Sequence, residues 1–89
     1  MPVAKETFVS LGRKYLGENG PIFVKIFLKR RSVYATQILL LGAMDRAWFS
    51  KRMTYEAAKK DYKLLGLDMR MIHRIRQRRD EREVWLAAR

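Results

Sequence analysis

Apolar positions recur along the chain in short stripes with helical spacing, and turn residues separate these stripes. Near the start, Phe8, Leu11 and Tyr15 are spaced as on one face of a helix, which predicts a short amphipathic helix. Gly17 marks a break after it, and Pro21 suits the first turn of another helix. The pattern therefore predicts a helix, a turn and a second helical segment.

The second half of the chain shows the same pattern with clearer boundaries. Residues 54–65 repeat apolar positions at helical spacing, so we expect an amphipathic helix there. Thr54 can cap its start, and Gly66 stands where a left-handed C-terminal cap is expected. Asp68 can cap a further helix, which continues into the all-polar stretch 76–83. These signals together predict an all-α protein.

Between these segments lies a nearly uncharged stretch, residues 32–49. Its core from Val33 to Met44 is roughly 18 Å long as a helix, and extension to Phe49 gives roughly 27 Å. A bilayer core requires roughly 20 apolar residues. Hydropathy leaves two structures open, a borderline membrane-spanning helix and a buried helix of a soluble domain. We expect one membrane-spanning helix that starts within residues 22–32 and ends near Phe49.

Length and composition limit what the chain can do alone. It has 89 residues, no cysteine and a single histidine, so disulfides are excluded and a metal site is not indicated. Chains this short usually need a disulfide, a metal or a partner for stability. We therefore expect no independent globular core, and no cooperative fold of the isolated chain in water.

The formal net charge of +11 favours nucleic acid, anionic lipid or an acidic protein as partner. Two basic arms, residues 1–31 and 51–89, flank the uncharged middle. The apolar run 21–28 followed by Lys29, Arg30 and Arg31 is typical of a segment at a membrane surface, with its cations at anionic headgroups such as those of cardiolipin.

The sequence gives no support for catalysis. It holds no Ser/His/Asp set, no Gly-rich phosphate loop and no paired carboxylates in an apolar context, so we expect neither enzyme activity nor a cofactor. The arginines of residues 74–82 can bind phosphates or form a solvated face of mixed charge. RNA binding by this run would gain from interleaved aromatic residues, and none lies between Leu64 and Trp85.

The middle helix carries polar residues on one face and small residues on the other. That arrangement suits contacts with neighbouring helices on both sides. Asp45 lies near the expected hydrocarbon boundary, where an acidic side chain is costly unless it is satisfied. Its neighbours one turn away on this helix, Leu41 and Phe49, are apolar. We therefore expect another subunit to supply a cation or hydrogen-bond donors to Asp45.

Residues 22–60 resemble subunit 9 of the mitochondrial cytochrome bc1 complex, complex III. That family combines an aromatic/aliphatic pair, two basic residues, Ser/Thr, a membrane helix with Gly-Ala near its end, an acidic-Arg-Ala-aromatic run and Tyr-Glu. The corresponding positions are Phe27-Leu28, Arg30-Arg31-Ser32, Gly42-Ala43, Asp45-Arg46-Ala47-Trp48 and Tyr55-Glu56. The terminal segments appear as additions, and the family's stretch after Tyr-Glu, Asn-x-Gly-Lys-Leu-Trp, is absent here.

The resemblance implies a non-catalytic, single-pass accessory subunit of the mitochondrial inner membrane, with its N-terminus in the matrix. It would pack beside cytochrome c1 and the iron–sulfur subunit. The implied organisation is a basic arm (1–20), a transmembrane helix with a basic lead-in (21–50) and a basic helical region (51–89). The expected contacts to partners or lipid are Lys29, Arg30, Arg31, Gln37, Gly42, Asp45, Arg46, Trp48 and Tyr55.

Two alternatives stay open beside this hypothesis. The chain can be a small basic mitochondrial ribosomal protein whose arms bind rRNA, which the high positive charge favours. It can also be an accessory subunit of another respiratory complex. High salt should release a ribosomal protein from rRNA, because phosphate contacts weaken steeply with salt. A spanning subunit should stay bound in high salt and should require detergent.

Overall fold

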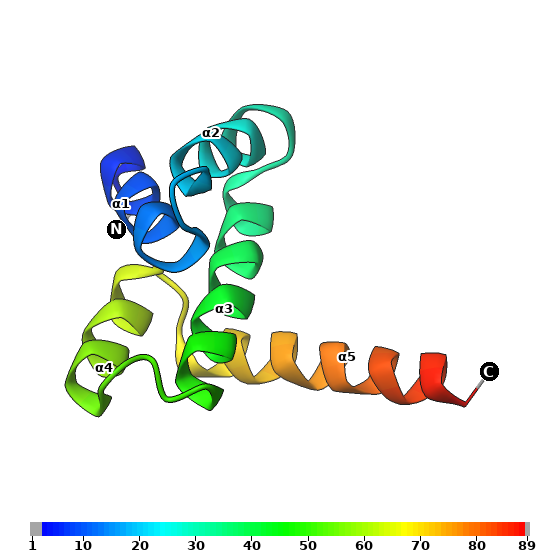
Figure 1. Ribbon diagram of the computed structural model, residues 1–89. Helices are drawn as coiled ribbons and strands as arrows, with labels where there is room; N and C mark the ends of the chain where they lie inside the picture. The colour runs from blue at the N-terminus through cyan, green and yellow to red at the C-terminus, as the bar shows by residue number, and fades with distance from the viewer. Residues whose placement is uncertain (1–2, 89) are drawn as a thin grey trace.

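A computed structural model describes residues 3–88 as five helices, the third of which lies at the centre (Figure 1). All described regular structure is helical, as the sequence predicts. The helices are α1 (Lys5–Leu16), α2 (Gly20–Arg30), α3 (Val33–Phe49), α4 (Tyr55–Leu64) and α5 (Met69–Ala87).

Local capping residues set most of the helix boundaries. The side chains of Ser32, Thr54 and Asp68 each accept a hydrogen bond from the backbone N–H three residues further on, which satisfies a free donor of the first turn. Gly66 follows α4 with a φ of 79°, a left-handed conformation that favours glycine. The predicted caps at Thr54, Gly66 and Asp68 are therefore confirmed.

A single helix through residues 22–49 does not form, because the chain breaks at Arg31 and Ser32. Ser32 is fully extended, with a φ of −173°, and its hydroxyl caps α3. The chain reverses there, so that α2 packs against α1 and the N-terminal part of α3 (Figure 1). The apolar segment is thus divided into one helix of 11 residues and one of 17.

The predicted membrane-spanning helix is wrong. No helix within residues 3–88 combines the length and the hydropathy that crossing a membrane requires. The longest apolar helix, α3, has 17 residues and so measures about 25 Å. Its apolar side chains Leu40, Leu41 and Met44 are fully buried by the chain's own helices, which is why a run resembling a membrane segment occurs here.

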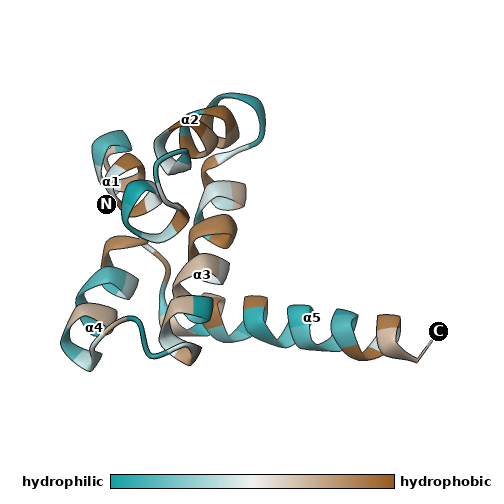
Figure 2. Cartoon of the chain, in the orientation of Figure 1, coloured by the Kyte–Doolittle hydropathy of each residue, from teal (hydrophilic) through white to brown (hydrophobic). Residues whose placement is uncertain are grey.

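The expectation that the chain has no independent core is also wrong. No single segment has enough apolar side chains for a core, but those of several helices combine around α3 into one apolar cluster. Figure 2 shows hydrophobic positions where α1, α2 and α3 meet. Burial of such surface is the main favourable term in folding. The cluster consists of Phe8, Leu11, Val24, Leu40, Leu41, Met44, Leu65, Leu67 and Ile72.

Two glycines allow α1 and α2 to approach closely. A Cβ atom built on Gly20 would overlap the carbonyl oxygen of Gly12. A Cβ built on Gly12 would lie 2.5 Å from the Val24 side chain. Hydrogen atoms at both positions therefore permit the backbone contact that joins the first two helices.

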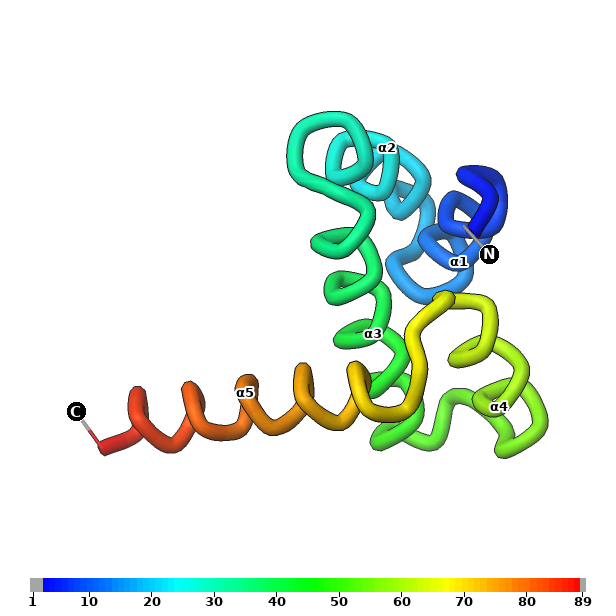
Figure 3. The backbone as a smooth tube through the Cα atoms, turned by 180° about the vertical axis from the view of Figure 1, so that it is seen from behind, coloured from blue at the N-terminus to red at the C-terminus, as the bar shows by residue number. Residues whose placement is uncertain are grey.

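Helix α5 differs from the others because most of it extends away from the body. Figures 1 and 3 show it crossing the C-terminal end of α3 and continuing into solvent. Ile72 is the one buried residue among Met69–Ala87. Figure 2 shows that α5 is largely hydrophilic, so apolar packing does little to hold it.

Candidate functional site

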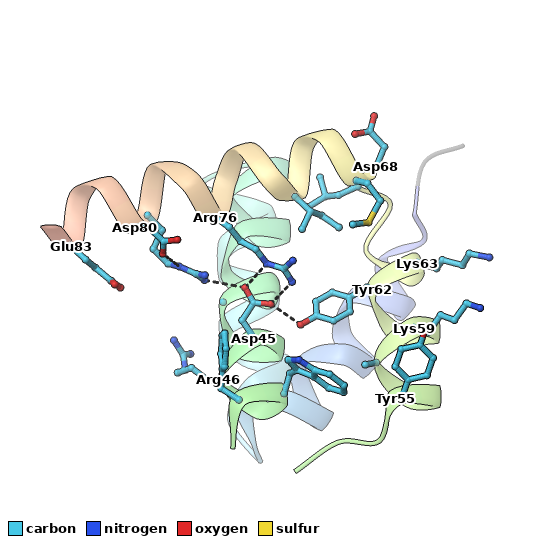
Figure 4. A pocket seen from close by; sticks show the side chains of 18 residues that line it. Asp45, Arg46, Tyr55, Lys59, Tyr62, Lys63, Asp68, Arg76, Asp80 and Glu83 are labelled. Carbon is cyan, nitrogen blue, oxygen red and sulfur yellow. Dashed lines mark hydrogen bonds and ion pairs between the residues drawn. The ribbon is translucent and has the colours of Figure 1, made fainter. Parts of the chain in front are cut away.

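The C-terminal half of α3, together with α4 and α5 as far as Glu83, lines a groove of about 1030 Å³ (Figure 4). Three consecutive helices meet here. Five of the nine predicted contact residues line this groove: Gly42, Asp45, Arg46, Trp48 and Tyr55.

Asp45 forms the polar centre of the groove. Its carboxylate accepts a two-pronged contact from Arg76, with Nη2 at 2.6 Å from Oδ1 and Nε at 3.0 Å from Oδ2. The Tyr62 hydroxyl donates to Oδ1 at 2.6 Å, and Arg79 Nη1 donates to Oδ2 at 3.1 Å. Figure 4 shows these donors converging on Asp45 from α4 and α5. Charge-assisted, bidentate contacts of this kind are strong and directional.

The surroundings of Asp45 keep it ionised. Burial opposes ionisation, but the hydrogen bonds from Arg76 and Tyr62 outweigh it and hold the pKa of Asp45 below its ordinary value. Burial and the same carboxylate raise the pKa of the Tyr62 hydroxyl, which therefore remains a donor. The guanidinium of Arg76 also lies 5.3 Å from the centre of the Tyr62 ring.

The prediction that another subunit satisfies Asp45 is corrected by this geometry. The cation and the donors exist, but they come from the same chain. The periodicity of α3 reveals only neighbours one turn away, whereas Arg76 is 31 residues further along the sequence. Arg76 reaches Asp45 only because α5 folds back across the end of α3.

Three large aromatic side chains are exposed beside this centre. Phe49 is 79% exposed and Tyr55 is 67% exposed, although apolar rings usually avoid water. The rings of Trp48 and Tyr55 lie 6.5 Å apart and are tilted by 57°. The sequence analysis selected Trp48 and Tyr55 but missed Phe49, whose position directly after Trp48 was the available signal.

Basic side chains accompany the aromatic ones. Arg46 lines the groove from α3, and Lys59 and Lys63 line it from α4. Figure 4 shows Lys59 and Lys63 on the opposite side of the site from Asp80 and Glu83, which belong to α5. The α4 side of the groove is therefore cationic, and the α5 side is mixed.

A second buried carboxylate, Asp61, also has partners within the chain. Lys14 Nζ lies 2.6 Å from Oδ2 of Asp61, and the Tyr15 hydroxyl donates to the same oxygen. Burial and this hydrogen bond raise the pKa of Tyr15. Both buried acids thus find their cations within the chain.

The other predicted contact residues lie away from the groove. Gln37 donates from Nε2 to the carbonyl oxygen of Leu65 at 2.9 Å, a contact that joins α3 to the end of α4. Lys29, Arg30 and Arg31 lie at the C-terminal end of α2, by the N-terminal end of α3. These four residues therefore do not join the five that line the groove.

Within residues 3–88 the structure contains no cluster of His, Asp and Glu side chains that could hold a metal ion. Among the charged groups of the groove, Asp45 pairs with Arg76 and Arg79, and Arg79 also lies 3.8 Å from Asp80.

Comparison with known proteins supplies no further identification. The resemblance to subunit 9 of complex III thus stays a prediction, and the groove has to be interpreted from its own residues. No protein-family model, curated protein or solved structure matches this chain.

Proposed function

We propose that this protein is a non-catalytic RNA-binding protein that holds unpaired nucleotides in the groove between α3, α4 and α5. One observation carries the proposal: exposed aromatic rings and basic side chains share a single groove. The aromatic residues are Trp48, Phe49 and Tyr55, and the basic ones are Arg46, Lys59, Lys63, Arg76 and Arg79.

The aromatic residues favour RNA over a purely electrostatic partner. Bases of single-stranded nucleic acid stack on exposed aromatic faces, and each such contact contributes about 1–3 kcal/mol. The arginine-rich part of α5 lacks aromatic residues in its own sequence. The fold places the α3–α4 corner, with Trp48, Phe49 and Tyr55, beside Arg76 and Arg79. The combination expected of an RNA site therefore arises from three helices.

The charge distribution favours one path for the RNA backbone. Lys59 and Lys63 offer free ammonium groups on the α4 side, where they can contact phosphates. Asp80 and Glu83 repel phosphates on the α5 side. Arg76 is committed to Asp45 and so maintains the shape of the groove.

The proposal agrees with the alternative of a small ribosomal protein bound to rRNA. Ribosomal RNA offers loops and bulges whose bases are unpaired, and such bases are the usual targets of sequence-selective RNA binding. The complex III hypothesis depended on a membrane-spanning helix, and residues 3–88 contain none. That hypothesis stays a prediction, whereas the residues of the groove support the RNA-binding alternative.

The test is binding of fluorescein-labelled RNA to the full chain, measured by fluorescence anisotropy. We compare a 12-nucleotide single strand, a hairpin with a large loop and a perfect duplex. The single strand and the loop should bind at least about tenfold more tightly than the duplex, because stacking needs unpaired bases. Affinity should also fall with salt, since phosphate contacts release counterions.

Two double variants examine the two halves of the site. Phe49→Ala with Tyr55→Ala should weaken binding of the single strand by about tenfold or more through loss of stacking. Lys59→Ala with Lys63→Ala should lower the slope of log affinity against log salt by about 1.4. Lys5→Ala with Arg13→Ala removes the same charge from the exposed surface of α1 and should leave the salt slope almost unchanged.

A spectroscopic measurement distinguishes stacking from charge attraction. In a Trp85→Phe background, Trp48 is the remaining tryptophan, and RNA should quench its emission. Unchanged Trp48 emission under saturating RNA, together with equal affinity for strand and duplex, would rule out the proposed groove.

A further inference from the structure

Helix α2 has apolar residues on two opposite faces, and only one of these faces is used by the fold. Val24 is fully buried against the core. Ile22, Phe23 and Ile26 point outward, with 57%, 50% and 46% of their surfaces exposed. The chain therefore leaves a large apolar stripe of α2 without a partner among the described residues.

The outward stripe has a defined shape. At about 100° per residue, Ile22, Phe23 and Ile26 fall within about 100° of the helix circumference. Lys25 and Lys29 follow one edge of that stripe, at helical positions next to Ile22 and Ile26. The outward face of α2 is thus apolar in its centre and basic along one border.

Cations also close the C-terminal end of the stripe. Arg30 ends α2, and the guanidinium of Arg31 lies 5.9 Å from the centre of the Phe27 ring. No acidic residue occurs anywhere in Gly20–Arg30. A surface for another protein would usually contain few lysines and would mix both signs at its rim. A stripe with cations along one edge and at its C-terminal end, and with no anion on the same helix, is complementary to a surface that is apolar inside and negative outside.

From this charge complementarity we propose that the outward face of α2 lies on an anionic lipid bilayer. Ile22, Phe23 and Ile26 enter the boundary between headgroups and acyl chains. Lys25 and Lys29 extend to the lipid phosphates, which long basic side chains can reach while their stems lie along apolar surface. The helix lies in the plane of the interface and does not span the bilayer.

The position of α2 makes this surface independent of the RNA groove. The α2–α3 turn lies at the N-terminal end of α3, whereas the groove begins at Gly42, about 14 Å further along the helix axis (Figure 1). Both surfaces can be occupied at the same time. The lipid proposal can therefore be tested independently of the proposed function. If both surfaces are occupied, the protein attaches RNA to a membrane.

Flotation of the full chain with vesicles tests the proposal. Vesicles of phosphatidylcholine with 30% phosphatidylglycerol should carry the protein to the top of a gradient, whereas pure phosphatidylcholine should carry at least about tenfold less. Phe23→Trp, placed in a chain with Trp48→Phe and Trp85→Phe, should show blue-shifted emission and quenching by brominated acyl chains.

Matched variants separate insertion from simple charge attraction. Replacing Ile22, Phe23 and Ile26 by serine should reduce the partition coefficient by tenfold or more, and Lys25→Ala with Lys29→Ala should reduce it by about twentyfold at low salt. Val84→Ser with Leu86→Ser on α5 and Lys5→Ala with Arg13→Ala on α1 serve as controls and should stay within about twofold to threefold of the wild type. Circular dichroism verifies that all variants keep their helices, as expected for exposed positions.

Two results would overturn the proposal. Absence of wild-type flotation with the anionic vesicles would exclude a lipid partner for α2. Equal binding of the serine variant and the wild type would show that non-specific charge, and not the apolar stripe, attracts the chain to vesicles.

Discussion

The first three helices and the last helix are held in place by different interactions. Helices α1, α2 and α3 pack through buried apolar side chains and through the Gly12–Gly20 contact. Helix α5 buries only Ile72 and is fixed by Arg76 on Asp45. Apolar burial is non-directional and gives most of the folding free energy, whereas charged hydrogen bonds fix orientation. Stability therefore resides in the N-terminal body, and the shape of the groove depends on polar contacts.

The largest expected effect comes from Leu40→Ala in the body. Leu40 is fully buried in α3, so the change removes apolar contacts and leaves a cavity. We expect a loss of about 3–4 kcal/mol in the free energy of unfolding. Urea denaturation followed by circular dichroism measures it, and the wild type should unfold in one cooperative transition.

Ile38→Ala serves as the matched control on the same helix, because Ile38 is 38% exposed. It should cost about 1 kcal/mol, since less surface returns to water. Equal losses at Leu40 and Ile38 would contradict the assignment of α3 as the centre of the core.

Gly20→Ala is expected to be the next largest perturbation. Its Cβ would overlap the carbonyl oxygen of Gly12, so α1 and α2 must separate, at a cost of about 2–3 kcal/mol. Gly42→Ala is the control, because the nearest atom to its Cβ would be Nη1 of Arg46 at 3.9 Å. In mid-helix that change should stabilise the protein by about 0.5–1 kcal/mol. Thermal unfolding of both variants compares them, and the two shifts should have opposite signs.

Asp45→Asn tests how α5 is attached. The change leaves Arg76 and Arg79 without their counter-charge, but both are about one-third exposed and can turn toward water. We therefore expect the free energy of unfolding to fall by about 2 kcal/mol, which is less than the loss expected for a fully buried ion pair. Hydrogen exchange should accelerate along α5 and remain slow in α1–α3. Asp80→Asn is the control, because Asp80 is exposed and lies 3.8 Å from Arg79, so its effect should stay under about 0.5 kcal/mol.

The same carboxylate predicts an acid dependence. The pKa of Asp45 is lower in the folded protein than in the unfolded chain, so its contribution is complete above about pH 4 and is lost as the pH falls through the folded pKa. Between pH 5 and pH 2 the free energy of unfolding should fall more for the wild type than for Asp45→Asn, because only the wild type loses this paired carboxylate. Parallel pH profiles of the two proteins would contradict this assignment.

The smallest effect is expected from ending the chain after Arg82. Residues 83–88 are exposed and extend beyond the body. Their removal should change the free energy of unfolding by less than about 0.5 kcal/mol. A loss above 1 kcal/mol would show that the outer part of α5 supports the fold and would weaken the contrast between the two regions.

Several features of the candidate site could be anticipated from the sequence, and others could not. The sequence predicts contact roles for Trp48, Tyr55 and Asp45, because aromatic and acidic side chains near an apolar run are typical of contact sites. Their grouping with Lys63 and Arg76 depends on how α4 and α5 turn back across α3. The apolar segment itself was misinterpreted, because a helix buried by its own chain and a short membrane helix have the same composition.

The sequence by itself determined the helical class and the capping signals at Thr54, Gly66 and Asp68. These features depend on hydrogen bonds and backbone preferences within about four residues, so a local pattern contains them. Only the tertiary structure decided that the apolar segment folds back at Ser32 and that Arg76 satisfies Asp45. Burial and ion pairing depend on residues distant in the chain, and their partners are defined only once the helices have packed.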